Sequence, residues 1–250
     1  EKQSRSVAVG KSGMAATSQP LATAAAIEVL QKGGSAVDAA IAANAVLCVT
    51  EPMSCGLGGD LFAIVWDAKA KKLHGLNASG RSPARLTMDE FRRRNLGEIP
   101  LVGPLPWSVP GCVSGWDTLH KEFGTQAFGA LLQPAIQAAR DGFVVTPIIA
   151  GYWKSAESTL RERPGSRSVF LVNGERSPKT GEVFQNAAMA RTLSAIASEG
   201  GNAFYQGKIA EALVRYSDQQ GGFLSMKDLA EHKADWVDPV SGDFRGYRVW

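Results

Sequence analysis

The amino-acid sequence predicts a mixed α+β fold, and three observations support this prediction. Two alanine-rich segments near the N-terminus have helical character, and a glycine-rich loop and two strand-like apolar segments follow them. The rest of the chain has mostly helical spacing and one late strand-like segment. Because no internal repeat, low-complexity tract or linker interrupts this order, we expect residues 1–250 to form a single domain.

Composition and charge exclude several classes of protein. Hydrophobic residues make up 44% of the 250 residues and charged residues 20%, which is ordinary for a globular protein and too apolar for disorder. The net charge is only +3, and the densest basic cluster, Arg92–Arg94, lacks interleaved aromatic residues. We therefore expect no nucleic-acid partner. No segment approaches the roughly 20 apolar residues of a membrane span, so we expect no membrane span either.

The N-terminal region is expected to contain a strand and then a helix. Residues 7–16 have strand-like composition with a glycine-rich interruption. Ser18 can act as an N-cap before Pro20, which suits a first helical turn. Helical spacing then continues from Leu21 to Lys32, and the two glycines that follow predict the end of this helix.

A second helix is predicted from Ser35, its expected N-cap, to about Val49. Alanine is frequent in this segment, at positions Ala36, Ala39, Ala40, Ala42, Ala43 and Ala45. Small side chains let a helix lie close to its neighbours. We therefore expect leucine at Ala40 or Ala43 to overpack the core.

The middle and C-terminal parts of the chain are predicted to contain a β-hairpin, several helices and one last strand. Residues 60–67 and 73–78 are apolar segments joined by a short lysine-rich turn, which is typical of a hairpin. Helical patterns begin near Thr87, and prolines then mark an extended connection up to Pro110. Further helices are expected at residues 113–123, 128–141, 187–198, 208–219 and 226–230, with a strand at 241–250.

The Gly56–Gly59 loop has the glycine content of a phosphate-binding loop but the wrong context. A dinucleotide-binding loop follows a strand and opens a helix, whereas here a helix precedes the glycines and a strand follows them. The loop also lacks the lysine of a P-loop. We therefore interpret these glycines as a tight passage of the backbone beside a site or packed neighbours.

Histidine and cysteine residues give no sign of a self-contained active site. The three histidines, which lie in unrelated contexts, are His74, His120 and His232. Without a GxSxG elbow they do not indicate a hydrolytic triad, and we expect them to be surface or core residues. The three cysteines, which lack metal-ligand spacing, are Cys48, Cys55 and Cys112. We expect buried free thiols, no metal and no catalytic residue in this chain.

Ordered motifs along the chain resemble the large subunit of γ-glutamyltranspeptidases. The most specific of them is Gly33–Ala40 (GGSAVDAA), which resembles the family's GGNAVDAA motif. The other matching segments are Gly13–Ala16, Ala22–Thr23, Glu51–Gly59, Ser82–Ala84, Val109–Gly115, Pro134–Ala135, Ala139–Phe143, Phe204–Gly207, Gly221–Gly222, Asp228–Leu229 and Ser241–Tyr247. The chain is therefore similar to the N-terminal part of such a large subunit.

This resemblance implies the αββα sandwich of N-terminal-nucleophile hydrolases, of which this chain supplies the large-subunit portion. In that family a precursor cleaves itself before a threonine, which becomes the nucleophile of a C-terminal small subunit. The implied activity is hydrolysis or transfer of γ-glutamyl groups from glutathione and related amides. No cofactor is implied, and the chain alone is expected to be inactive. Localisation stays open between the periplasm or exterior, as for typical family members, and the cytoplasm.

Two positions depart from the transpeptidase pattern and bear on the substrate. An arginine four residues before the proline of the APA motif holds the substrate α-carboxylate in the family's transpeptidases, but here that position is Ser79. Arg81 lies two residues further on, and the period of a strand could bring Arg81, Ser79 and Asn77 to one face. We therefore predict Arg81 and Ser79 as substrate-binding residues. The second departure is Asp60, which stands where a small residue is usual.

Three functions remain open at this point, and the first is the hydrolysis or transfer of γ-glutamyl groups described above. Arg81 either substitutes for the missing arginine or is a surface residue in a branch that binds another acyl group. The second possibility would suit either of two divergent branches of the family, the γ-glutamyltranspeptidase-like proteins or the cephalosporin acylases, which act on glutaryl-type side chains. From a different class of function, the chain could be a degenerate binding protein without catalytic activity.

Overall fold

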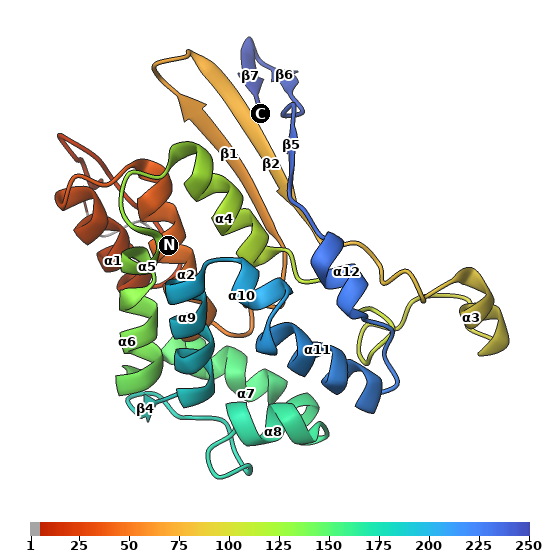
Figure 1. Ribbon diagram of the computed structural model, residues 1–250. Helices are drawn as coiled ribbons and strands as arrows, with labels where there is room; N and C mark the ends of the chain where they lie inside the picture. The colour runs from red at the N-terminus through yellow and green to blue at the C-terminus, as the bar shows by residue number, and fades with distance from the viewer. Residues whose placement is uncertain (1–5) are drawn as a thin grey trace.

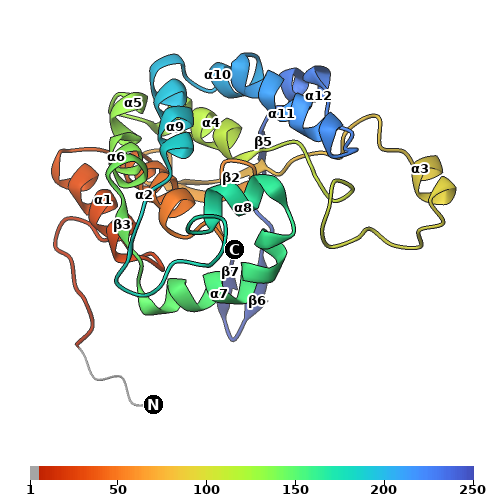
Figure 2. The same ribbon diagram turned by 90° about the horizontal axis from the view of Figure 1, so that it is seen from below.

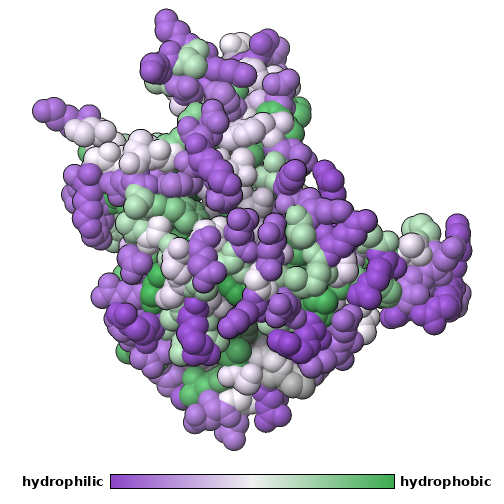
Figure 3. Space-filling model, in the orientation of Figure 1, coloured by the Kyte–Doolittle hydropathy of each residue, from purple (hydrophilic) through white to green (hydrophobic). Residues whose placement is uncertain are grey.

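The structure is a computed structural model that describes residues 6–250. An antiparallel sheet stands at one end of the molecule, and helices make up most of the remaining body (Figure 1). Seen from below, the body is broad, and a long arm that carries the short helix α3 (Met88–Arg93) projects away from it (Figure 2). On the face shown in Figure 3 this arm is largely hydrophilic, whereas hydrophobic surface appears between the helices of the body.

The first two helices form a hairpin at the N-terminal side of the body. Helix α1 spans Pro20–Gln31 and α2 spans Ala36–Thr50, close to the predicted ranges. Ser35 caps α2 as predicted, because its hydroxyl accepts the N–H of Asp38 while the Asp38 carboxylate accepts the N–H of Ser35.

Two predictions for the N-terminal region were wrong. Residues 7–16 form no strand in the described chain, where no neighbouring strand pairs with them. The N-cap of α1 is Gln19, whose side chain accepts the N–H groups of Leu21 and Ala22. The predicted cap, Ser18, instead donates a 2.5 Å hydrogen bond to the buried carboxylate of Glu51 at the end of α2. That bond joins the start of α1 to the end of α2.

The alanine-rich helix α2 is buried on most of its surface, as predicted, but one of its faces is open. Ala42 and Ala45 are fully buried, and Ala43 is buried but lines a groove beneath residues 12–17. Ala40 is exposed and lines the same groove. The expectation that Ala40 packs tightly was therefore wrong, because the segment above it does not close over this face.

Leucine at Ala42 should lower the free energy of unfolding by about 1–3 kcal/mol, because Ala42 is fully buried away from the groove and the added atoms enter a filled core. Leucine at Ala40 on the same helix should change it by less than about 0.5 kcal/mol, since its side chain enters the open groove. Urea unfolding of the two variants gives the comparison. Equal unfolding midpoints would show that the burial of a position on α2 does not decide whether it accepts a larger side chain.

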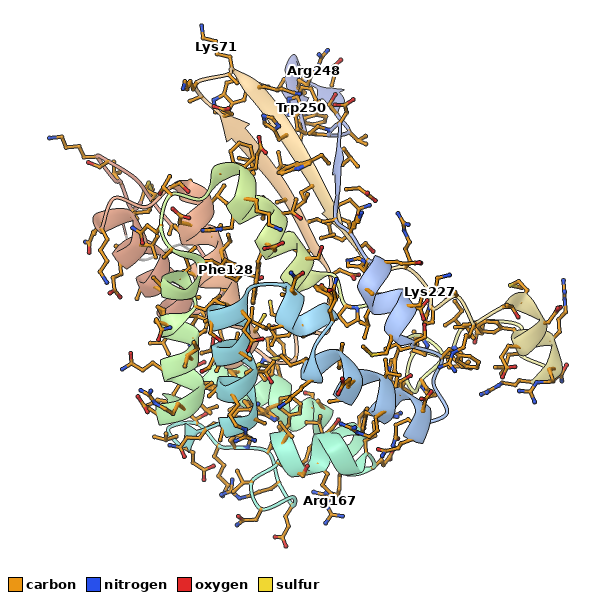
Figure 4. All side chains as sticks on the ribbon, viewed as in Figure 1. Lys71, Phe128, Arg167, Lys227, Arg248 and Trp250 are labelled. Carbon is orange, nitrogen blue, oxygen red and sulfur yellow. The ribbon has the colours of Figure 1, made fainter. Side chains whose placement is uncertain are left out.

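The predicted β-hairpin is present and forms the sheet with one late strand. Strand β1 spans Leu61–Asp67, β2 spans Lys72–Ala78 and β5 spans Asp235–Val237, in the order β1-β2-β5. Both pairs are antiparallel, with Leu61 opposite Ala78 and Asn77 opposite Asp235. The turn of the hairpin lies at the far tip of the molecule, where Figure 4 labels Lys71.

The two faces of this sheet have different neighbours. Helix α4 (Cys112–Phe123) packs on one face, where a Cβ at Gly115 would meet the Leu61 and Ala78 side chains. On the opposite face of β1, Phe62 is 68%, Ile64 56% and Trp66 60% exposed. Such a row of large exposed apolar side chains is rare on the surface of a finished globular protein. We call this the open face of the sheet.

The helical body follows α4 along the chain. Its helices are α5 (Phe128–Leu131), α6 (Gln133–Asp141), α7 (Pro147–Arg161), α8 (Pro164–Phe170), α9 (Ala187–Glu199), α10 (Asn202–Tyr205), α11 (Lys208–Gln219) and α12 (Met226–Glu231). Trp116 and Trp153 are fully buried in this body, and each indole N–H is satisfied, by Asn44 Oδ1 and by the Phe170 carbonyl respectively.

Several elements differ from the predictions. The helix expected at 128–141 is divided at Leu132, because Pro134 has no N–H to continue the ladder. Helices α7 and α8 were not predicted, and neither was β5. The strand expected at 241–250 is a hairpin of β6 (Gly242–Phe244) and β7 (Tyr247–Val249), since positive φ angles at 245–246 reverse the chain. A short pair, β3 (Phe143–Val144) and β4 (Val183–Phe184), completes the fold.

Candidate functional site

Three backbone segments cross at the carboxyl end of β2. The Gly59 carbonyl accepts the N–H groups of Gly111 and Cys112, both at 2.9 Å, at the start of α4. The Val109 N–H donates to the Arg81 carbonyl at 2.9 Å. These bonds hold the loop before β1, the segment after β2 and the loop before α4 in one fixed arrangement.

Two glycines make this close approach possible. A Cβ added to Gly80 would lie 1.7 Å from the Val109 carbonyl oxygen, and one added to Gly111 would lie 1.8 Å from the Ala78 carbonyl oxygen. By contrast, a Cβ on Gly58 would meet nothing within 4 Å. The tight passage expected in the Gly56–Gly59 loop therefore lies mainly at the two segments that this loop faces.

A group of polar residues surrounds the crossing on the open face. Asp60 Oδ1 accepts the Gly80 N–H at 2.9 Å, and the Asp60 Oδ2 to Ser79 Oγ distance is 3.5 Å, at the outer limit of a hydrogen bond. Asn77 Oδ1 accepts the Ser79 N–H at 2.9 Å. Arg81 Nη2 lies 3.2 Å from Asp235 Oδ2, in an ion pair that joins the end of β2 to β5.

Arg81 and Ser79, the predicted substrate-binding residues, thus lie at the same end of the sheet. The alternation of β2 places Asn77 on the open face, and Ser79 and Arg81 continue beyond it to contact residues of the neighbouring strands. The Arg81 side chain is 79% exposed. Their role in substrate binding stays a prediction. We call Asp60, Asn77, Ser79, Arg81 and Asp235 the polar cluster.

Sequence reasoning missed the contacts of two members of this cluster. Asp60 stood out as a departure from the family pattern, but its link to Ser79 and Gly80 required the register of the hairpin. Asp235 had no signal at all, because β5 is a short exposed strand far along the chain. Arg85, the next arginine along the sequence, lies outside this cluster and holds the α11–α12 region by contacts to Asp218 and to two backbone carbonyls.

The three histidines have separate surroundings in the structure. His74 packs against Phe123 and Trp236 under the sheet, and His120 Nε2 lies 2.7 Å from the Gln126 carbonyl oxygen. His232 lies near the polar cluster, where burial and then the charge of Arg81 lower its pKa, against the opposing effect of two nearby carboxylates. It is therefore expected to be neutral at pH 7.

The cysteines and the acidic residues offer no metal site in the described chain. Cys48 and Cys112 are buried free thiols, as predicted, while Cys55 is half-buried. A hydrogen bond with Cys112 and burial both raise the pKa of Cys48, so this thiol stays protonated. Among residues 6–250, no group of three or more His, Cys, Asp or Glu side chains is arranged to hold a metal ion.

None of the helices within residues 6–250 is both long enough and apolar enough to cross a bilayer.

Comparison with known proteins agrees with this geometry. A family profile for γ-glutamyltranspeptidase matches residues 22–250. The chain is 36% identical over 249 residues to a glutathione hydrolase proenzyme of Bacillus subtilis, which covers 98% of this chain and 42% of the relative. A glutathione hydrolase-like proenzyme of the same organism is 34% identical over 243 residues, covering 97% and 46%. The chain thus spans less than half the length of these curated relatives.

Solved structures show the same architecture. The cephalosporin acylase from Bacillus halodurans is 41% identical, with a TM-score of 0.93 over 100% of this chain and 47% of that chain. The γ-glutamyltranspeptidase of Helicobacter pylori is 31% identical, with a TM-score of 0.92 over 98% of this chain and 70% of that chain. Helices on one face of a sheet with an open second face are therefore the large-subunit portion of an N-terminal-nucleophile hydrolase sandwich, which confirms the predicted fold class.

The chain belongs to the γ-glutamyltranspeptidase family, as the sequence motifs predicted. Its matches include both glutathione hydrolases and cephalosporin acylases, so membership in the family does not by itself decide the acyl group.

Proposed function

We propose that this chain is the large-subunit part of an enzyme that hydrolyses or transfers γ-glutamyl groups from glutathione and related amides. The observation that carries this proposal is the polar cluster, which sets an exposed arginine at the end of an otherwise apolar open face. A cluster of this kind beside uncovered apolar surface suits a site completed by another polypeptide.

The missing part is a C-terminal small subunit from the same precursor, with residues 1–250 acting as a single domain. Two observations support this partner. The open face exposes Phe62, Ile64 and Trp66, and the relatives that span about twice this length are proenzymes. A second layer over this face would bury these side chains and bring a nucleophile to the end of β2.

The proposed reaction begins with a threonine of the small subunit. Its hydroxyl oxygen attacks the amide carbonyl of the substrate while its own α-amino group takes the hydroxyl proton. The C–N bond then breaks, the amine leaves with a proton, and the acyl-enzyme passes its acyl group to water or to an amino acceptor. The groups of the large subunit bind and orient the acyl chain and take no part in bond formation.

Arg81 has the chemistry to bind the substrate carboxylate. Its Nη2 donates to Asp235, and within residues 6–250 no other bond of this guanidinium is found, so its remaining donors can face a ligand. A carboxylate that arrived there would share the arginine with Asp235. Ser79, which stands where the transpeptidases have an arginine, adds a hydroxyl at the same end of the sheet.

Cephalosporin acylase activity is the second candidate. This chain has Ser79 in place of the arginine that binds the amino-acid acyl group in the transpeptidases. In addition, the acylase from Bacillus halodurans is 41% identical to this chain. A glutaryl-type side chain carries one carboxylate and no α-amino group, and a single arginine can satisfy that carboxylate.

A release assay on the complete gene product distinguishes these candidates. We expect the processed protein to release p-nitroaniline from γ-glutamyl-p-nitroanilide at least about tenfold faster, as kcat/KM, than it deacylates a glutaryl cephalosporin. The 250-residue chain alone should release neither product, because it lacks the nucleophile. The reverse order of rates would identify an acylase. A gene product without a downstream threonine and without activity would indicate a degenerate binding protein.

A further inference from the structure

Three groups of contacts fix the backbone of residues 79–81. The side chain of Asn77 accepts the Ser79 N–H, and the side chain of Asp60 accepts the Gly80 N–H, both at 2.9 Å. The Val109 N–H donates to the Arg81 carbonyl at 2.9 Å. This short segment leaves the sheet at Ala78, so side chains and a loop replace the ladder bonds that it has lost.

Asp60 contacts this segment from the start of the neighbouring strand of the hairpin. It lies immediately before β1, directly across from Ser79 in the register that pairs Leu61 with Ala78. One of its oxygens binds the backbone of the segment, and the other faces the Ser79 hydroxyl. The two residues that depart from the family's transpeptidase pattern, Asp60 and Ser79, therefore face each other across the hairpin.

The Arg81 side chain itself is held by a single contact, the 3.2 Å pair with Asp235, and both partners are more than half exposed. Exposed pairs of this kind contribute little by themselves. The direction in which Arg81 leaves the chain therefore depends mainly on the backbone at Gly80 and Arg81. That backbone is held by the Asp60 carboxylate on one side and by Val109 on the other.

We propose that Asp60 is a positioning residue for substrate binding: its carboxylate holds the Ser79–Arg81 segment so that the Arg81 guanidinium meets the acyl group of the substrate. This inference rests on the proposed function of Arg81. It adds a residue that does not touch the substrate and acts through the Gly80 N–H.

The test is a double-mutant cycle in the complete processed enzyme, measured as kcat/KM for γ-glutamyl-p-nitroanilide. Asp60→Ala should lower kcat/KM by roughly tenfold, because displacement of a binding group by about 1 Å is enough for such a loss. Asp60→Asn keeps an oxygen for the Gly80 N–H and should stay within about threefold of the parent. In the Arg81→Ala background, Asp60→Ala should cost less than about twofold, since there is no arginine left to position.

The matched control is Asp67→Ala at the other end of β1. Asp67 also accepts two backbone N–H groups after its strand, those of Lys69 and Ala70, but at the distant hairpin turn. It should leave kcat/KM unchanged. The melting temperatures of all variants show whether a loss of activity follows from unfolding.

The outcomes separate this inference from the proposed function. If Arg81→Ala lowers kcat/KM but the Asp60 effect is the same with and without Arg81, the positioning role is wrong and the role of Arg81 stands. If Asp60→Asn is as poor as Asp60→Ala, the negative charge matters and the hydrogen bond does not, which also overturns the proposal. Unchanged kcat/KM in Arg81→Ala would contradict the proposed function itself.

Discussion

Replacement of Gly111 by alanine should lower the free energy of unfolding by roughly 3 kcal/mol or more, at the upper end of the range for overpacking. The added Cβ would lie 1.8 Å from the Ala78 carbonyl oxygen, and backbone atoms cannot rotate away as a side chain can. Movement of Gly111 would also stretch its 2.9 Å hydrogen bond to the Gly59 carbonyl. The φ angle of Gly111 is −106°, so the penalty is steric and does not come from a left-handed conformation.

Gly58→Ala is the control for this prediction. Gly58 lies in the neighbouring loop, where an added Cβ meets nothing within 4 Å, and its φ is not among the positive ones. Its free energy of unfolding, measured by urea titration, should stay within about 0.5 kcal/mol of that of the parent protein. Equal destabilisation of the two variants would mean that the crossing is not as tight as described.

Asp38→Ala should cost about 2–4 kcal/mol, because it leaves several donors without an acceptor. The Asp38 side chain is 0% exposed, and its carboxylate accepts the N–H groups of Ser35 and Thr125 and the Thr125 hydroxyl at 2.6 Å. These bonds join the start of α2 to the loop after α4. The aspartate of the GGSAVDAA motif thus has a structural role. Asp38→Asn, which keeps one oxygen, should lose less.

The pH dependence of stability provides a second measurement on Asp38. Burial opposes its ionisation, but the hydrogen bonds from Thr125 and Ser35 outweigh burial and lower its pKa below the ordinary value of 3.8. The stability from this carboxylate is therefore present above pH 3.8 and is lost as the pH falls through the lowered folded-state pKa. Acid titration of unfolding should lack this component in Asp38→Ala. If Asp38→Ala had the same dependence of unfolding free energy on acid pH as the parent protein, the lowered pKa of Asp38 would contribute nothing to stability.

Local patterns were enough to predict the elements that depend on local chemistry. The Ser35 cap, the alanine-rich helix and the lysine-rich hairpin turn all follow from residues close in sequence, and the structure confirms each of them. The strand expected at residues 7–16 failed for the opposite reason. A strand needs a partner, and no residue pattern within the segment shows whether one is present.

The candidate site was predictable only in part for the same reason. The two-residue period of side chains along a strand was enough to predict that Asn77, Ser79 and Arg81 could share one face, because this period depends on a single strand. The contacts of Asp60 needed the register of two strands, and those of Asp235 needed a strand more than 150 residues away in sequence. The residues around Gly80 and Gly111 did not show why glycine is needed there, since the reason is the closeness of backbone carbonyls from other segments.

The kcat/KM of Arg81→Ala in the complete processed enzyme tests the central claim most directly, since that claim assigns the acyl-binding site to the polar cluster. Loss of a charge-assisted contact should lower kcat/KM by about ten- to a hundredfold. Arg81→Lys should recover only part of this loss, because an ammonium group cannot reproduce the bidentate fork of the guanidinium. Arg92→Ala, which removes an equally exposed and ion-paired arginine from the projecting arm, should have no effect. Unchanged kcat/KM in Arg81→Ala would contradict the account.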